Sequence, residues 1–203
     1  MNYLIKGFLI GFAIAAPVGP IGVLCIRRTL ADGRLIGFLS GLGAATADMF
    51  YGSVAAFGLT IVQEILIGQR IWFRLIGGLF LLYLGIRTLL SKPVEITANT
   101  KSSGNGLMGA YLSTVFLTLT NPATIISFTV IFAGLGFANI NGNYFSAAFL
   151  VCGVFLGSAS WWLTLSTGIG FLREHFTPDW MIWVNRIAGA VIMAFGVAAL
   201  VTL

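Results

Sequence analysis

Six long apolar stretches, separated by short polar connections, account for most of the chain. Each has about the 20 residues that a helix needs to cross the hydrocarbon core of a bilayer. The shorter alternating strands that are typical of an outer-membrane barrel are not seen in the pattern. The pattern predicts an all-α integral membrane protein whose six transmembrane helices cover approximately Tyr3–Ile26, Leu35–Val62, Ile71–Leu90, Leu107–Ala133, Tyr144–Phe171 and Trp180–Leu203.

The composition agrees with a chain that has lipid as its main solvent. Hydrophobic residues make up 58% of the chain and charged residues only 8%, whereas about 25% charged residues is usual in soluble domains. The net charge is +5, but the basic residues stand at the ends of apolar stretches, which argues against nucleic-acid binding. No catalytic triad, carboxylate pair, phosphate loop or cluster of cysteine and histidine is seen in the sequence, so we expect neither an enzyme nor a metal or cofactor site.

The basic residues also predict the topology of the helices. Those near the first, third and fifth connections are Arg27, Arg28, Arg34, Arg87, Lys92, Lys101 and Arg173. Those near the opposite ends of the helices are Lys6, Arg70 and Arg74. Because an excess of basic residues favours the cytoplasmic side, we expect the odd connections in the cytoplasm and both termini outside.

The two halves of the chain resemble each other. A segment that begins at Arg74 is similar to one that begins at Arg186. At the same offset, four residues of the second helix align with four of the fifth: Gly41 with Gly153, Ala45 with Gly157, Asp48 with Ser160 and Gly52 with Thr164.

Three helices per half is an odd number, so the two halves must insert with opposite orientation. We therefore expect a single transmembrane transporter domain over residues 1–203 that consists of two inverted three-helix repeats. The first repeat covers about 1–90, a polar linker covers about 91–106, and the second repeat covers about 107–203. Inverted repeats are typical of secondary transporters, which bind substrate near the midplane between the halves.

The first helix contains two prolines deep in its apolar stretch. Pro17 and Pro20 flank Gly19, and proline removes a backbone donor and clashes with the preceding turn. This pattern predicts a broken helix, which is tolerated at that depth only inside protein or beside a wet cavity. The half-helix that follows would present free N–H groups and a positive dipole end, which favour an anionic group. A packing kink is the alternative interpretation.

The fourth helix has a similar interruption at Asn121 and Pro122. Interrupted helices at corresponding positions of two halves are typical of transporter binding sites. The candidate substrate-binding residues are therefore Pro17, Gly19, Pro20, Asn121 and Pro122, with Tyr51 and Trp161 as further candidates whose alternative role is packing.

Asp48 is the acidic residue that lies well inside a predicted span. A charge at mid-helix costs about 2.5–3.5 kcal/mol on insertion scales. A charged residue at this depth is therefore expected to have a structural or functional role. Glycines and alanines recur around it at three- and four-residue spacing, which turns the carboxyl group toward a close helix contact and not toward lipid. Asp48 is the candidate for proton coupling, and the alternatives are a partner for a substrate amine or a structural anchor.

The motifs around Pro17-x-Gly19-Pro20, Asp48 and Asn121-Pro122 resemble those of the LysE/RhtB family of bacterial amino-acid exporters, and the resemblance covers the whole chain. Two departures are Val18, where the family often has Pro-Gly-Pro, and Ala47, where glycine often precedes the aspartate. The resemblance implies a multi-pass protein of the bacterial inner membrane that exports amino acids or similar small solutes by proton antiport.

The implied partners are the lipid bilayer, a small-molecule substrate such as an amino acid or derivative, and protons, without a cofactor or nucleic acid; homo-oligomerisation is left open. One alternative function is export of a divalent metal cation, although such ions usually need more than one carboxylate. Another is thiol–disulfide electron transfer through Cys25 and Cys152, which have no flanking redox motif.

Overall fold

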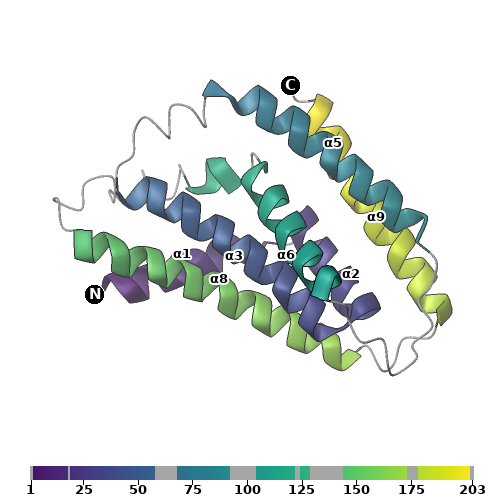
Figure 1. The fold of residues 1–203 in the computed structure, drawn as a ribbon, viewed down its shortest axis with the longest axis horizontal. Coiled ribbons are helices and arrows are strands. Elements are labelled where there is room, and N and C mark those ends of the chain that lie inside the picture. The colour runs from purple at the N-terminus through teal and green to yellow at the C-terminus, as the bar shows by residue number, and fades with distance from the viewer. Residues whose placement is uncertain are drawn as a thin grey trace.

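The computed structural model describes residues 2–17, 19–57, 68–91, 104–121, 124–128, 144–172 and 178–201. Within these ranges the regular secondary structure is entirely α-helical (Figure 1). A further short helical segment covers residues 124–128. The named helices are α1 (Tyr3–Ala15), α2 (Pro20–Asp32), α3 (Arg34–Ala56), α5 (Arg70–Leu89), α6 (Gly104–Leu119), α8 (Tyr144–Leu172) and α9 (Pro178–Val201).

The predicted break in the first helix is confirmed. Helix α1 ends at Ala15 and α2 begins at Pro20, and the two axes differ in direction by 81°. Proline suits the first position of a helix because its missing N–H would have no intrahelical partner there. Gly19 is the extended N-cap of α2 and provides no side-chain cap, so the first N–H groups of α2 face outward from the helix end.

The connection between α2 and α3 is shorter than the sequence predicts. Arg27 and Arg28 were expected to flank a connection, but α2 continues to Asp32, and Gly33 alone separates the two helices. Its φ of 105° lies in the region that favours glycine. The predicted end of the first span at Ile26 is therefore wrong, because both arginine side chains find hydrogen-bond partners within the helical structure.

Several helices are suited to a membrane. Three segments are long and apolar enough to cross one, namely Ile71–Leu89, Tyr144–Leu172 and Ile182–Val201, and the bent pair α1 and α2 would be a fourth. The apolar segment Gly106–Leu119 is shorter. The prediction of an α-helical membrane protein is thus confirmed, whereas six spans in two inverted repeats remain a prediction. The predicted linker lies outside the described residues except at Ser91 and residues 104–106.

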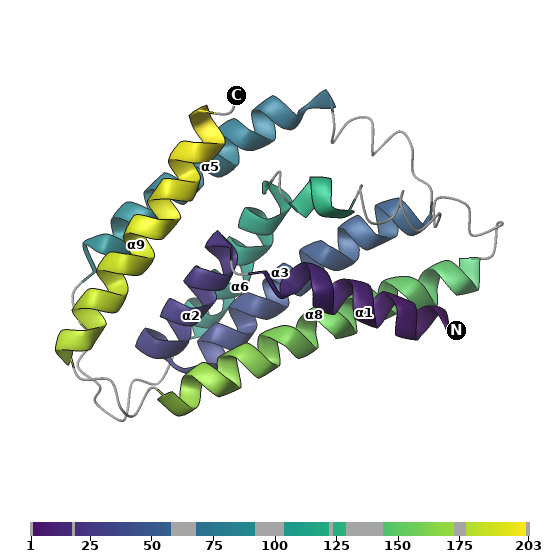
Figure 2. The same cartoon turned by 180° about the vertical axis from the view of Figure 1, so that it is seen from behind.

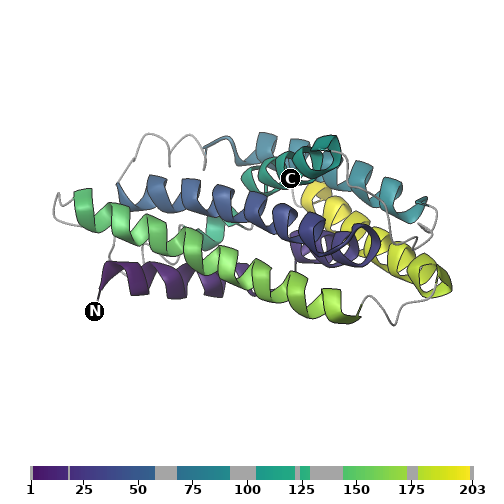
Figure 3. The ribbon, with the colours of Figure 1, turned by 60° about the horizontal axis from the view of Figure 1, so that its bottom comes forward.

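Helix α8 lies between α1 and α3 and packs along both (Figure 3). Its contact with α1 is a seam of glycines, with Gly7 and Gly11 on the α1 side. A Cβ at either glycine would collide with the backbone of Leu150 or Val154, and a Cβ at Gly157 would collide with the backbone of Phe8. Small residues let helix backbones approach closely where no hydrophobic force drives association, so these glycines hold α1 against α8.

Helices α5 and α9 form a second unit. They run antiparallel and pack along each other (Figures 1 and 2), with Gly85 and Gly189 at a similar close approach. This α5–α9 pair contacts the remaining helices mainly through α2, with a smaller contact to α6. In both views the pair lies near α2 at the start of α9 and diverges from α3 toward the end of α9.

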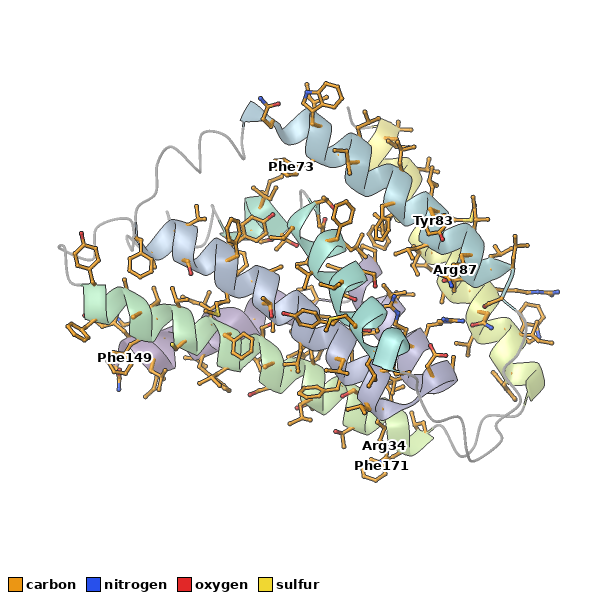
Figure 4. The ribbon with its side chains drawn as sticks, in the orientation of Figure 1. Arg34, Phe73, Tyr83, Arg87, Phe149 and Phe171 are labelled. Carbon is orange, nitrogen blue, oxygen red and sulfur yellow. The ribbon has the colours of Figure 1, made fainter. Side chains whose placement is uncertain are left out.

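The predicted gathering of the odd connections at one end is confirmed for the described residues. Arg27 of α2 donates to Asn185 near the start of α9 and to Ser91 just after α5. Arg34, at the start of α3, stacks on the ring of Phe171 at the end of α8, with 4.2 Å between its guanidinium carbon and the ring centroid (Figure 4). The ends of α2, α5 and α8 therefore lie on one side of the molecule.

Candidate functional site

A cavity of about 420 Å³ lies where the two broken helices approach α3, α5 and α9. It is lined by Pro17, Gly19 and Pro20 from the break between α1 and α2, and by Asp48 from α3. Asn121, at the end of α6, also lines it. The structure thus brings together residues that are far apart in the sequence and that were predicted to form one site. Pro122 lies outside the described residues.

Most of the remaining lining residues are apolar. The others include threonine and serine residues from one part of the chain. The apolar residues include Leu81 of α5, Leu117 of α6 and Phe195 of α9. The hydroxyl groups come from the end of α6 and the segment after it: Thr118, Thr120, Thr124 and Ser127. A mostly apolar cavity with a few convergent polar groups is the usual form of a small-molecule site.

Asp48 is 3% exposed and belongs to a buried chain of hydrogen bonds. The hydroxyl of Ser158 on α8 donates to Asp48 Oδ2 at 2.7 Å, and Trp162 Nε1 donates to Ser158 Oγ at 3.2 Å. This arrangement fixes the carboxyl group and occupies one of its oxygens. Asp48 also lines the cavity, so the fixed carboxyl group lies at the cavity wall.

The end of α6 is interrupted as predicted. The Asn121 N–H donates to the Thr118 carbonyl at 3.2 Å, a tighter turn than that of an α-helix. The Asn121 carbonyl in turn accepts from the N–H groups of Thr124 and Ile125 at 3.1 and 3.3 Å, which starts the helical segment 124–128. The hydroxyl of Thr118 donates back to Thr114 O at 2.8 Å, so its proton is engaged within α6.

Tyr51 and Trp161 are not among the described residues that line this cavity. The Tyr51 hydroxyl donates to the Leu119 carbonyl, which belongs to the last turn of α6. Trp161 packs edge-on against Phe12 of α1, with 5.3 Å between ring centroids. Their observed contacts are those of packing and backbone support, and a direct role in substrate binding remains a prediction.

Ser158 and Trp162 are the site residues that sequence reasoning missed. The alignment of the two halves pairs Asp48 with Ser160, but the hydrogen bond is made by Ser158. The available signal was the spacing of Ser158 and Trp162, four residues apart on one face of α8. That spacing gives a tryptophan donor an acceptor within its own helix.

The alternative chemistries gain no support from the described residues. Among them, no group of three or more His, Cys, Asp or Glu side chains could hold a metal ion. Cys25 is buried on α2 and Cys152 is exposed on α8, and both are free thiols. Neither arrangement favours metal export or thiol–disulfide transfer.

A family model described as LysE type translocator matches residues 12–203. The chain belongs to this family. The chain is 24% identical over 199 residues to "Putative amino acid efflux protein YcgF" of Bacillus subtilis (strain 168), an alignment that covers 97% of this chain and 94% of that relative. The family membership confirms the resemblance seen in the sequence.

Two further relatives are similar to this chain over most of their length. It is 23% identical to "Uncharacterized membrane protein YrhP" of Bacillus subtilis (strain 168), with 86% of this chain and 87% of the relative covered. It is 27% identical to "Uncharacterized membrane protein YahN" of Escherichia coli (strain K12), with 84% and 76% covered. No solved structure matches the chain significantly. As a family member with several apolar helices, the chain is a multi-pass membrane protein that handles a small-molecule substrate.

Proposed function

We propose that the protein exports amino acids or similar small solutes from the cytoplasm across the bacterial inner membrane, by proton antiport with alternating access. The observation that carries this proposal is the cavity itself. It combines a buried carboxylate, Asp48, with the free N-terminal end of α2 and the interrupted end of α6. A similar relative bears the name of an amino acid efflux protein, which supports this class of substrate.

In this proposal the two ends of an amino acid bind different parts of the cavity. The substrate carboxylate binds the first N–H groups of α2, where the helix dipole favours negative charge. The hydroxyl groups after α6 and the Asn121 side chain hydrogen-bond its other polar atoms. The side chain of the substrate packs against the apolar lining from α5, α6 and α9.

Asp48 carries the coupled proton. It is suited to this role because it combines burial, a fixed orientation and access to the cavity. Proton and substrate then occupy the same cavity in turn, which is how an antiporter couples an inward proton to an outward solute. A substrate ammonium group competing for the carboxylate is the alternative role, and a structural anchor is the third.

The helix arrangement supports an inverted repeat, from which alternating access follows. Helices α3 and α8 occupy equivalent places in the two halves and run antiparallel while in contact, as do α5 and α9 (Figure 1). The contact of α1 with α8 has its counterpart in that of α6 with α3. Both pairs of contacts are those expected if the second half has the inverted orientation of the first.

The test is transport by the purified protein in proteoliposomes, with Asp48→Asn and, as a matched control on the same helix, Ser53→Ala. Ser53 bonds only its own helix, at Met49 O. If Asp48 carries the proton, Asp48→Asn abolishes uptake driven by a pH gradient but retains exchange of labelled for unlabelled substrate.

Loss of both activities at normal folded yield would assign Asp48 to the substrate amine instead. Unchanged gradient-driven transport would remove Asp48 from the mechanism. The substrate itself is found by profiling metabolites in the medium of cells with and without the protein, and the absence of any amino acid or derivative among the exported solutes would reject the proposed substrate class.

A further inference from the structure

Beyond the cavity, toward the end where α2, α5 and α8 finish, three side chains form an apolar plug. They are Leu24 of α2, Leu84 of α5 and Ile192 of α9, which are 2%, 6% and 1% exposed and belong to one core cluster. Each lies about one helical turn from a cavity-lining residue of its own helix. Along all three helices, the plug residues therefore lie between the cavity and this end of the molecule.

One to two turns past the plug, polar contacts join the same three helices. Arg27 Nε donates to Asn185 Oδ1 at 2.9 Å, and Arg27 Nη2 donates to Ser91 Oγ at 3.1 Å. Asn185 Nδ2 donates to the Ser91 carbonyl at 3.4 Å. Asn185 is only 2% exposed, so this polar network is buried at the boundary between α2 and the α5–α9 pair.

The neighbouring Arg28 makes a different set of contacts. Its guanidinium donates to Ser40 of α3 and to the Ala110 carbonyl, Thr114 and Ser113 of α6, at 2.8–3.0 Å. These four bonds attach α2 to α3 and α6. Adjacent arginines thus hold α2 to different partners: Arg28 to the helices around α3, and Arg27 to the α5–α9 pair.

The hydrogen bonds of Arg27 and those of Arg28 differ in whether the arginine keeps a charged partner when they break. Arg27 also lies 3.7 Å from the Asp32 carboxylate within its own helix, so its charge keeps a partner if Asn185 and Ser91 move away. A buried charge left unpaired is costly, and the α5–α9 pair has few other contacts with the remaining helices. The boundary between α2 and the α5–α9 pair, at Arg27, is accordingly the one that can open.

We propose that Arg27, Asn185 and Ser91 form a latch that keeps the cavity closed at this end, and that the α5–α9 pair moves away from α2 as a unit when the latch opens. This inference rests on the alternating access of the proposed function, but it identifies which boundary opens and which residues hold it. Opening separates Leu84 and Ile192 from Leu24 and connects the cavity to the side that carries the ends of α2 and α5.

The experiment measures how fast a cysteine in the plug is labelled. The reporter is Leu84→Cys in a background with Cys25→Ala and Cys152→Ala, reconstituted in proteoliposomes and exposed to a membrane-impermeant maleimide. Asn185→Ala breaks the latch, and Arg186→Ala is the matched control because Arg186 is exposed on the same helix and stacks on Trp183.

Labelling should be about tenfold faster in Asn185→Ala than in Arg186→Ala, since loss of a hydrogen bond to a charged group shifts an equilibrium by roughly that factor. Asn185→Asp gives a second test that does not depend on weakening the fold. It places a carboxylate against Arg27 and removes the long bond from Asn185 to the Ser91 carbonyl. Because a bond between two charged groups is stronger than that neutral 3.4 Å bond, labelling should become slower than in the parent.

Equal labelling rates in the parent, Asn185→Ala and Asn185→Asp would overturn the latch, as would faster labelling in Asn185→Asp. Labelling requires no substrate or gradient. A latch confirmed in this way would stand even if amino-acid export were rejected by metabolite profiling, and a failed latch would leave the export assay intact.

Discussion

Replacing Ser158 with alanine removes one hydroxyl group that serves two buried partners. Ser158 donates to Asp48 Oδ2 and accepts from Trp162 Nε1. Its own side chain is 0% exposed, and the change to alanine deletes a single oxygen atom. The substitution therefore tests the hydrogen bonds around Asp48 with little disturbance of the packing between α3 and α8.

The expected loss of stability follows from these two bonds. Interhelical hydrogen bonds in membrane proteins contribute about 0.6 kcal/mol on average and about 1.7 kcal/mol at most. The bond to the carboxyl group is short, at 2.7 Å, so we place it near the upper value. The 3.2 Å bond from Trp162 lies within α8, and we assign it about 0.5 kcal/mol, the lower end for a typical intramolecular hydrogen bond. The free energy of unfolding should fall by about 2 kcal/mol, or roughly 30-fold in the equilibrium constant.

The assay is reversible unfolding in mixed micelles, with Ser158→Ala, Asp48→Ala and the double variant forming a thermodynamic cycle, because alanine at position 48 leaves no acceptor for the Ser158 hydroxyl. We expect a coupling free energy of about 1–1.7 kcal/mol between the two sites. The control is Ser160→Ala, which should change the free energy of unfolding by less than about 0.5 kcal/mol. Additive effects of Ser158→Ala and Asp48→Ala would refute the reasoning, because the bond between the two side chains would then contribute nothing.

Two further substitutions test the supports of the site. Gly157→Ala should destabilise the protein by about 1–3 kcal/mol, because its Cβ would collide with the backbone of Phe8. The control is Gly168→Ala on the same helix. Its Cβ would meet open space, so this change should be neutral or stabilising by up to about 1 kcal/mol. Thermal unfolding followed by size-exclusion chromatography distinguishes them, and equal melting shifts would contradict the glycine seam. Tyr51→Phe should lower the free energy of unfolding by about 1 kcal/mol, since the Leu119 carbonyl loses its donor, and an unchanged value in mixed micelles would show that the bond contributes nothing.

The local breaks and the buried acid could be predicted from the sequence. Proline chemistry is local, so Pro17 and Pro20 indicate where α1 ends and α2 begins. The small residues around Asp48 indicate which way its side chain points, because a helix places residues three and four apart on one face. Both inferences need no knowledge of the neighbouring helix.

The partners of those residues could not be predicted in the same way. An alignment of two halves identifies equivalent positions and not contacts, which is why it gives Ser160 where the structure has Ser158. Trp161 and Trp162 are adjacent in sequence, but neighbouring residues point about 100° apart around a helix, and only Trp162 lines the cavity. That difference depends on how α8 is rotated against α1 and α3.

The arginines show a different limit of sequence reasoning. Charged residues at the end of an apolar stretch are usually taken to mark its boundary, and this predicted that Arg27 and Arg28 flank a connection. The structure keeps them within α2 because seryl, threonyl and amide groups on α3, α6 and α9 satisfy their donors. Those acceptors come from parts of the chain that no local pattern relates to α2.

The depth of Asp48 along α3 has an electrical consequence. Helix α3 has 23 residues, from Arg34 to Ala56, so Asp48 lies about 21 Å from its start and about 12 Å from its end at 1.5 Å per residue. If α3 spans the membrane, a proton that reaches the carboxyl group from the Arg34 end crosses roughly three-fifths of the voltage drop. At 100 mV that amounts to about 1.4 kcal/mol, or about tenfold in occupancy. Protonation from the two sides of the membrane would then respond unequally to voltage, so the membrane potential would influence turnover independently of the pH difference.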